Sequence, residues 1–203
     1  DGVYNYLSAL RVASDDKATD KGILVVMNDE IHAAKYVTKT HTTNVATFHT
    51  PTHGPLGIIM KHDILWFKTA EPRVRFDLEQ ITGTVPIIKA YAGMGIGDGI
   101  ISLLDPEKID GVVIEALGAG NLPPLAAREI TNLMEKGVPV VLVSRCFNGI
   151  AEPVYAYEGG GVKLQEAGVM FVKELNAPKA RLKLLIALSA GLKDQELKDY
   201  IEG

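Results

Sequence analysis

The chain has 203 residues, of which 47% are hydrophobic and 23% are charged, a composition typical of one large folded domain or two small ones. Its formal net charge of −4 provides no basic stripe for phosphate contacts, so the sequence predicts no nucleic-acid partner. No apolar run approaches the ~18 residues of a membrane span, which predicts no membrane association. The single cysteine, Cys146, excludes an intrachain disulfide, and we expect it to be a small buried thiol.

The first third of the chain mixes helical and extended patterns. Apolar residues at near-helical spacing predict an amphipathic helix over residues 4–14. The β-branched run 23–27 predicts a strand that is buried on both faces, as in a parallel sheet. Two short apolar runs, 56–60 and 64–67, flank a polar turn and predict a β-hairpin.

The rest of the chain alternates regularly between strand and helix patterns. This alternation, over residues 85–190, predicts a parallel sheet with helices on both faces. A polar segment that contains proline precedes it and is typical of a linker. The predicted boundaries are therefore 1–70, a linker at 71–84, and 85–203. The predicted strands are 85–90, 111–116, 138–143 and 169–172, and the predicted helices are 100–104, 124–136, 162–167, 176–190 and 194–201.

One lysine lies among hydroxyl side chains. Lys39 stands in the segment 37–48, VTKTHTTNVATF, which we interpret as extended chain plus loop. A lysine held in a polar, partly dry pocket can move protons, and nearby threonines can fix its amine. Exposed strand lysines are commoner than catalytic ones, so these residues alone leave both states open.

Two further patterns resemble ligand sites but contain an opposing residue. The loop 93–99 has glycines between a strand and a predicted helix, but Asp98 stands where a phosphate loop needs glycine. A tight turn with Asp98 as a helix N-cap is favoured. His49 and His53 have the spacing of metal ligands on a helix, but Pro51 opposes a helix there. The sequence thus predicts neither a cofactor nor a metal.

Several segments carry a resemblance that extends, in the same order, over nearly the whole chain. The segment 37–48 closely resembles VTKTNTTDVATF of the bacterial L-asparaginase family, and GILVVMND at 22–29 resembles that family's GVLVVMND. The resemblance implies an α/β fold: the rear part of a larger α/β N-terminal domain at 1–70, and a flavodoxin-like parallel-sheet C-terminal domain at 85–203. Further matches are the N-terminal Asp1-Gly2, GPLG at 54–57, GVVIEALGAGN at 111–121 and NAPKAR at 176–181.

The family's chemistry is what the resemblance implies for function. Its members hydrolyse L-asparagine to L-aspartate and ammonia, often with weaker action on L-glutamine. A threonine attacks the side-chain amide to form an acyl-enzyme, and a Thr-Asp-Lys triad, in which Lys39 would be the lysine, organises proton transfer. The GGTI-like and TDT-like segments that carry the other triad members have no match here. We therefore expect the nucleophile to lie outside this chain, and the chain alone to be inactive.

The resemblance implies two further site residues in the second part. Gly93 stands where one class of members has an asparagine that reaches a neighbouring subunit's active site, so only its backbone could contribute. Glu158 is the expected match for a glutamate sent into that neighbour from the long C-terminal loop, with Glu152 as the competing candidate. His41 either supports the lysine segment or is an ordinary polar side chain.

The implied assembly is a homotetramer with active sites between subunits. A companion N-terminal segment or chain is also expected, because the first part alone should expose apolar surface and an open sheet edge. Two alternatives remain: a subunit of a larger amidotransferase, and a non-catalytic doubly wound module that binds a small ligand such as a nucleotide or an amino acid. Release of ammonia from asparagine separates hydrolase from binding module.

Overall fold

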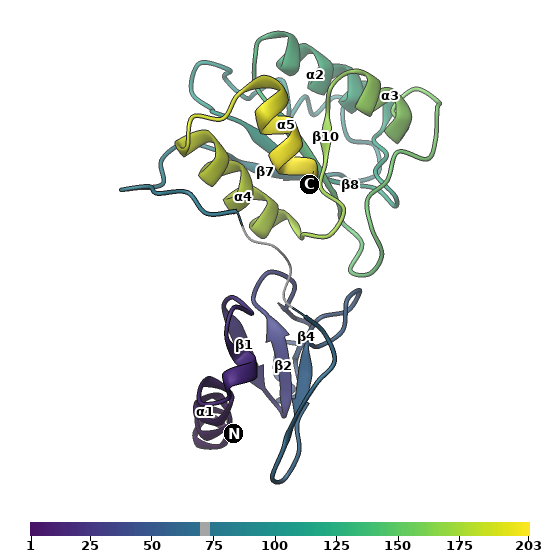
Figure 1. The fold of residues 1–203 in the computed structure, drawn as a ribbon. Coiled ribbons are helices and arrows are strands. Elements are labelled where there is room, and N and C mark those ends of the chain that lie inside the picture. Colours follow the sequence, from purple (N-terminus) through teal and green to yellow (C-terminus); the bar gives the residue numbers. More distant parts are fainter. Residues whose placement is uncertain (70–73) are drawn as a thin grey trace. The chain divides into compact units, whose positions relative to one another are not determined.

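The fold is described from a computed structural model, which covers residues 1–69 and 74–203 (Figure 1). The chain divides into two compact units, Asp1–Val74 and Arg75–Gly203, and each is described by itself. Residues 71–73 of the predicted linker lie outside the described residues. Among the described residues, no helix is both long and apolar enough to cross a bilayer.

The first unit packs one helix on an antiparallel sheet. Helix α1 (Gly2–Ala13) is followed by a short 3₁₀ turn, η1 (Asp16–Ala18), and the four strands lie in the order β1-β2-β5-β6. The strands are β1 (Leu24–Met27), β2 (Glu30–Ala33), β5 (Gly57–Ile59) and β6 (Ile64–Trp66). The core between helix and sheet is formed by Val12, Val26, Ile31 and Ile59. The predicted helix and the predicted hairpin are both confirmed.

A second, two-stranded sheet carries the lysine segment. Strands β3 (Thr38–Lys39) and β4 (Phe48–His49) pair antiparallel, in agreement with the predicted extended chain plus loop. Side chains alternate along β2: Ile31 enters the core beneath α1, so Glu30 and His32 point to the opposite face. His32 is nevertheless fully buried, and His49 of β4 approaches Glu30, so β4 packs against that opposite face.

The prediction for the first strand is wrong in two respects. Strand β1 is antiparallel to β2, and only Val26 of its four residues is buried. The turn between β1 and β2 consists of Asn28 and Asp29, both with positive φ, the backbone of a two-residue hairpin turn. That turn forces an antiparallel pair, and β1 lies at the edge of the sheet, where its residues other than Val26 are partly buried. Large apolar side chains on the outer side of α1 are exposed as well, among them Val3, Tyr6 and Leu7.

The second unit is a parallel sheet between two layers of helices (Figure 1). The strand order is β10-β9-β8-β7, and every pairing is parallel, as predicted. The strands are β7 (Ile87–Lys89), β8 (Val112–Ala116), β9 (Val140–Ser144) and β10 (Met170–Phe171). The helices are α2 (Pro124–Glu135), α3 (Gly161–Glu166), α4 (Ala177–Ser189) and α5 (Asp194–Glu202).

The two faces of this sheet form separate cores. On β8, Val112 and Ile114 pack with α2 and α3, whereas Val113 packs with α4 and α5. The central strands are therefore buried on both faces and are continuously apolar, which is the pattern expected of parallel strands. The α/β fold predicted for residues 85–203 is confirmed.

Two local predictions in the second unit are wrong. Residues 100–104 form turns instead of a helix, so Asp98 caps no helix. Its carboxylate accepts hydrogen bonds from the Gly95 backbone N–H and from the Tyr91 hydroxyl, which closes the preceding loop on itself. Cys146 is exposed, because it lies in the loop after β9, beyond the end of the buried strand.

Candidate functional site

Lys39 lies on the outer strand of a hairpin whose tip is closed by side-chain hydrogen bonds. It is the second residue of β3, is exposed, and pairs with Phe48. Beyond it, the backbone N–H and the hydroxyl of Thr40 both donate to the Thr47 carbonyl, at 2.8 and 2.9 Å. The Thr47 hydroxyl accepts from the His41 N–H at 2.8 Å and donates to the His41 carbonyl at 2.6 Å. The Thr40 and Thr47 hydroxyls thus hold the backbone of the hairpin in shape, and these hydrogen bonds join them to backbone groups instead of the Lys39 amine.

The ring of His41 builds the tip of the same hairpin. Its Nδ1 accepts hydrogen bonds from the backbone N–H groups of Thr43 and Asn44, at 3.1 and 3.0 Å. The Asn44 side chain in turn accepts from the Ala46 N–H at 2.9 Å. Because its Nδ1 accepts from two backbone donors, the His41 ring shapes the tip of the loop.

A partly buried polar cluster lies beneath β4, and the sequence interpretation missed it. The Nδ1 of His32 lies 2.9 Å from the Thr50 hydroxyl, and its Nε2 lies 3.3 Å from Glu30 Oε2. The Nδ1 of His49 lies 3.4 Å from the same Glu30 oxygen. Burial lowers the pKa of His32 and outweighs the opposing attraction of Glu30, so the ring is held neutral. Part of the cluster could have been predicted from the alternation of side chains along a strand, because residues 30 and 32 share one face of the strand.

The histidine pair singled out by its spacing does not form a metal site. His49 is in β4, whereas His53 lies in a turn and stacks on the ring of Tyr36 at 4.0 Å between ring centroids. Among residues 1–69 and 74–203, no group of three or more histidine, cysteine, aspartate or glutamate side chains could hold a metal ion.

Gly93 lies in the loop that follows β7, at the carboxyl edge of the parallel sheet, where open α/β sheets bind ligands. Its φ of +81° is in the left-handed region, and a Cβ added there would meet no atom within 4 Å. In the same loop, Asp98 engages the Gly95 N–H at 2.8 Å, so that donor is not free for a phosphate. The loop is therefore poorly suited to nucleotide binding.

Glu158 lies in the long loop before α3 and is paired with α2. Its Oε1 accepts from the Nε of Arg128 at 2.6 Å, and both side chains are more than half exposed. The pair borders a surface pocket of about 490 Å³ whose other polar lining residues are Thr131, Asn132 and Lys163. The competing candidate, Glu152, is also exposed, and its backbone N–H donates to the Ala119 carbonyl.

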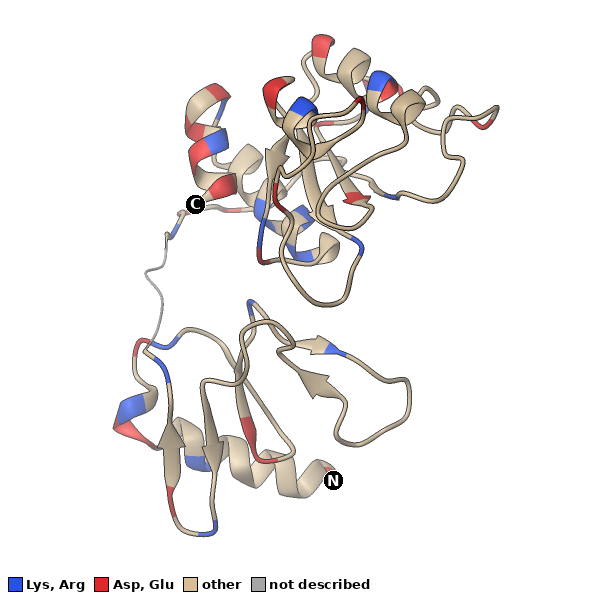
Figure 2. Cartoon of the chain, turned by 90° about the vertical axis from the view of Figure 1, so that its right-hand side faces the viewer, with Lys and Arg blue, Asp and Glu red and all other residues tan. Residues whose placement is uncertain are grey.

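The predicted site residues are divided between the two units. Lys39 belongs to the first unit, and Gly93 and Glu158 belong to the second. Within the second unit, Glu158 pairs with Arg128 and not with the Gly93 loop. Figure 2 shows acidic and basic residues interspersed along both units.

Comparisons with known proteins bear on both units. A sequence model described as "Asparaginase, N-terminal" matches residues 1–72, and one described as "Glutaminase/Asparaginase C-terminal domain" matches residues 84–201. The two units are thus those of a two-domain α/β chain of the glutaminase/asparaginase class. Because the C-terminal match alone covers more than half of the chain, the chain belongs to the asparaginase family.

Individual relatives agree with this membership. A probable L-asparaginase of Deinococcus radiodurans is 40% identical over 98% of this chain and 61% of the relative. An L-asparaginase of Bacillus licheniformis is 30% identical over 96% of this chain and 61% of the relative. The crystal structure of a probable cytoplasmic L-asparaginase from Campylobacter jejuni has a TM-score of 0.83 and 26% identity, over 99% of this chain and 61% of that one. The chain therefore spans about three fifths of the length of these relatives.

Proposed function

We propose that the chain is part of an enzyme that hydrolyses L-asparagine to L-aspartate and ammonia, with slower hydrolysis of L-glutamine. Family membership and the names of the relatives support this reaction. Because the chain spans 61% of those relatives, the activity is assigned to the intact protein, which we propose is a homotetramer. The companion N-terminal portion completes the site.

The chemistry needs a nucleophile, a proton carrier and an oxyanion site. A threonine hydroxyl outside these 203 residues attacks the side-chain carbonyl carbon of asparagine, and backbone N–H groups stabilise the oxyanion. The C–N bond then breaks, and the hydroxyl proton passes through the Lys39 amine to the departing ammonia. Water hydrolyses the resulting ester, which releases aspartate and restores the threonine.

The observation that carries this proposal is the position of Lys39 within a hairpin that is closed by hydrogen bonds. Thr40 and Thr47 fix the backbone directly beyond the lysine, and the amine is exposed and so accessible to the companion portion. No threonine of this hairpin is assigned as the nucleophile. The Thr40 and Thr47 hydroxyls are already engaged with backbone groups.

The test is Lys39→Met in the intact protein. General acid–base groups contribute about 10²–10⁴-fold to rate, so kcat for asparagine should fall by at least about 100-fold while the thermal midpoint stays close to that of the parent. Lys61→Met is the matched control, because Lys61 is an exposed lysine in the β5–β6 turn of the same unit. Near-normal ammonia release from the Lys39→Met protein would refute the assigned role.

A further inference from the structure

The cluster beneath β4 connects the lysine hairpin to the sheet of the first unit. We infer that Glu30, His32, His49 and Thr50 form a positioning cluster that sets where Lys39 is held, with Glu30–His49 as its central contact. This inference rests on the proposed function of Lys39. None of the four residues is taken to touch substrate.

The strand pairing implies that Lys39 is held in place through β4. In the described residues β3 pairs with β4 alone, in a register that joins Lys39 to Phe48 and Thr38 to His49. The residue that directly follows β4, Thr50, contacts the buried ring of His32. Any displacement of β4 relative to β2 would therefore displace the strand that bears Lys39.

The hydrogen-bonding groups at the two ring nitrogens of His49 show how this ring can link Glu30 to the hairpin. Its Nε2 lies 2.9 Å from the Ala46 carbonyl, which only accepts, so Nε2 carries a hydrogen. Its Nδ1 lies 3.4 Å from Glu30 Oε2, so the ring bridges Glu30 and the hairpin tip.

The second histidine completes the cluster without adding charge. His32 is fully buried on the same strand as Glu30, and its Nε2 lies 3.3 Å from the Glu30 oxygen that faces His49. The titratable groups that face Glu30 are thus His32 from β2 and His49 from β4. Glu30 is the shared partner of both rings, so replacing it should loosen the hairpin more than replacing either ring alone.

The experiment compares disruptive and conservative variants in the intact protein. Glu30→Ala should lower kcat for asparagine about tenfold and His49→Ala somewhat less, both with KM nearly unchanged, because a small displacement of a proton carrier affects the chemical step. Glu30→Gln should restore most of kcat, because its amide keeps the length of the side chain and can either donate to or accept from His49 Nδ1. The double alanine variant should be no slower than the worse single variant, because both remove the same contact.

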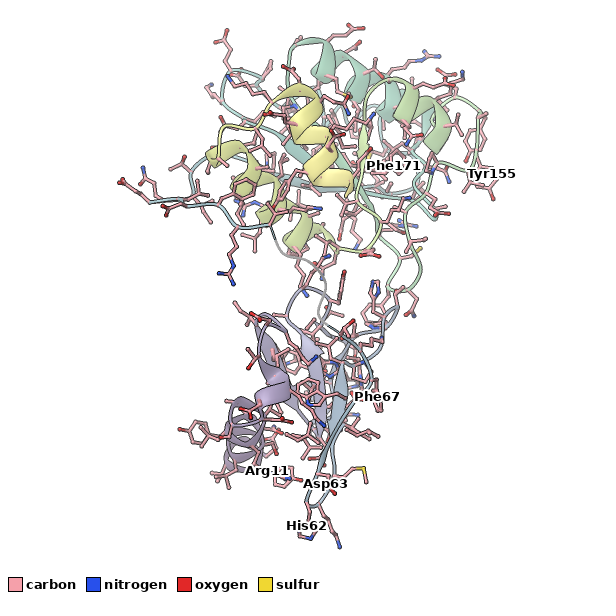
Figure 3. All side chains as sticks on the ribbon, in the orientation of Figure 1. Arg11, His62, Asp63, Phe67, Tyr155 and Phe171 are labelled. Atoms are coloured by element: carbon pink, nitrogen blue, oxygen red, sulfur yellow. The ribbon has the colours of Figure 1, made fainter. Side chains whose placement is uncertain are left out.

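A second readout is independent of activity. Amide hydrogen exchange of residues 38–49 should speed up in Glu30→Ala and in His49→Ala, and return towards the parent rate in Glu30→Gln. His62→Ala is the matched control, because His62 lies in the β5–β6 turn and should change neither readout (Figure 3).

The outcomes separate this inference from the proposed function. If Lys39→Met abolishes turnover but Glu30→Ala keeps both normal kcat and normal exchange, the positioning cluster is wrong and the function stands. If Lys39→Met keeps turnover, the proposed role of Lys39 fails. Unchanged hydrogen exchange in Glu30→Ala would then also overturn the claim that the cluster holds the hairpin of residues 38–49 in place. A Glu30→Gln variant as slow as Glu30→Ala would likewise refute the proposed contact.

Discussion

Arg128 on α2 donates from Nε to Oε1 of Glu158 at 2.6 Å, and this pair joins the long loop before α3 to the helix that follows β8. Both side chains are largely exposed, at 64% and 54%, so water and salt screen the pair and it contributes little to stability. Glu158 can therefore leave Arg128 at small cost, which the role expected for it at a neighbouring subunit's site would require.

Two variants separate a substrate role of Glu158 from simple pairing. Glu158→Gln should raise KM for asparagine about tenfold or more, the loss expected for one charge-assisted hydrogen bond to the substrate. Arg128→Met removes the same ion pair but leaves the carboxylate, and should change KM less than about twofold. Equal effects of the two variants in steady-state assays would mean that Glu158 matters only as the partner of Arg128.

The stability of the first unit should depend on pH through His32. Burial lowers the pKa of the folded ring below the ordinary 6.5, so the unfolded chain takes up a proton at a higher pH than the folded chain does. The contribution of His32 is therefore fully present above about pH 7 and is lost as pH falls through 6.5 towards the folded pKa. Hydrogen exchange of β2 amides between pH 7.5 and 5, corrected for intrinsic rates, measures this loss. It should be smaller in His32→Gln, and an identical pH dependence in parent and variant would contradict the assignment.

Gly120 is required by packing as well as by backbone conformation. Its φ is +125°, and a Cβ there would lie 2.7 Å from Cε1 of Phe171, which is buried in the second unit (Figure 3). Gly120→Ala should therefore lower the free energy of unfolding by about 2–3 kcal/mol, because overpacking adds to backbone strain. Gly118→Ala is the control: it also has positive φ, but its Cβ would meet nothing within 4 Å. Urea denaturation should show a cost of about 1 kcal/mol there, and equal costs at both sites would exclude the packing term.

The N-cap of α4 is the clearest local stability determinant. The Asn176 side-chain oxygen accepts from the Lys179 backbone N–H at 3.2 Å, and Pro178 follows in the first turn. Asn176→Ala should lower the free energy of unfolding by about 1 kcal/mol, whereas Asn176→Ser should keep most of it. The measurement is the denaturation midpoint at constant slope, and an unchanged midpoint in Asn176→Ala would show that the cap bond is not stabilising.

Several parts of the fold follow from local patterns. The continuous apolar runs at β8 and β9 predict buried parallel strands, and Asn176 with Pro178 predicts where α4 begins. The β1 prediction failed because a short apolar run fits either kind of sheet, and the turn at Asn28 and Asp29 decides between them. The expected helix at 100–104 is replaced by turns, and the Asp98 carboxylate bonds the Tyr91 hydroxyl and the Gly95 N–H of its own loop.

The candidate site was predictable only where one continuous segment carries it. Lys39 could be singled out because its threonine neighbours adjoin it and close the same hairpin. Arg128 could not be matched to Glu158, because the two are 30 residues apart and meet only through the path of a long loop. The cluster of Glu30, His32 and His49 was missed for the same kind of reason, because His49 lies on β4 and meets the two β2 residues only through the path of the chain between these strands.

By itself the amino-acid sequence determined the order of the strands in the second unit and of its helices α2 to α5, the lysine segment, and the resemblance that the comparisons confirm. Those features depend on side-chain periodicity and on residues adjacent along the chain. Only the tertiary structure decided that a glutamate and two histidines meet beneath β4. Such contacts depend on strand register and loop path, which place distant residues together and which no local pattern encodes.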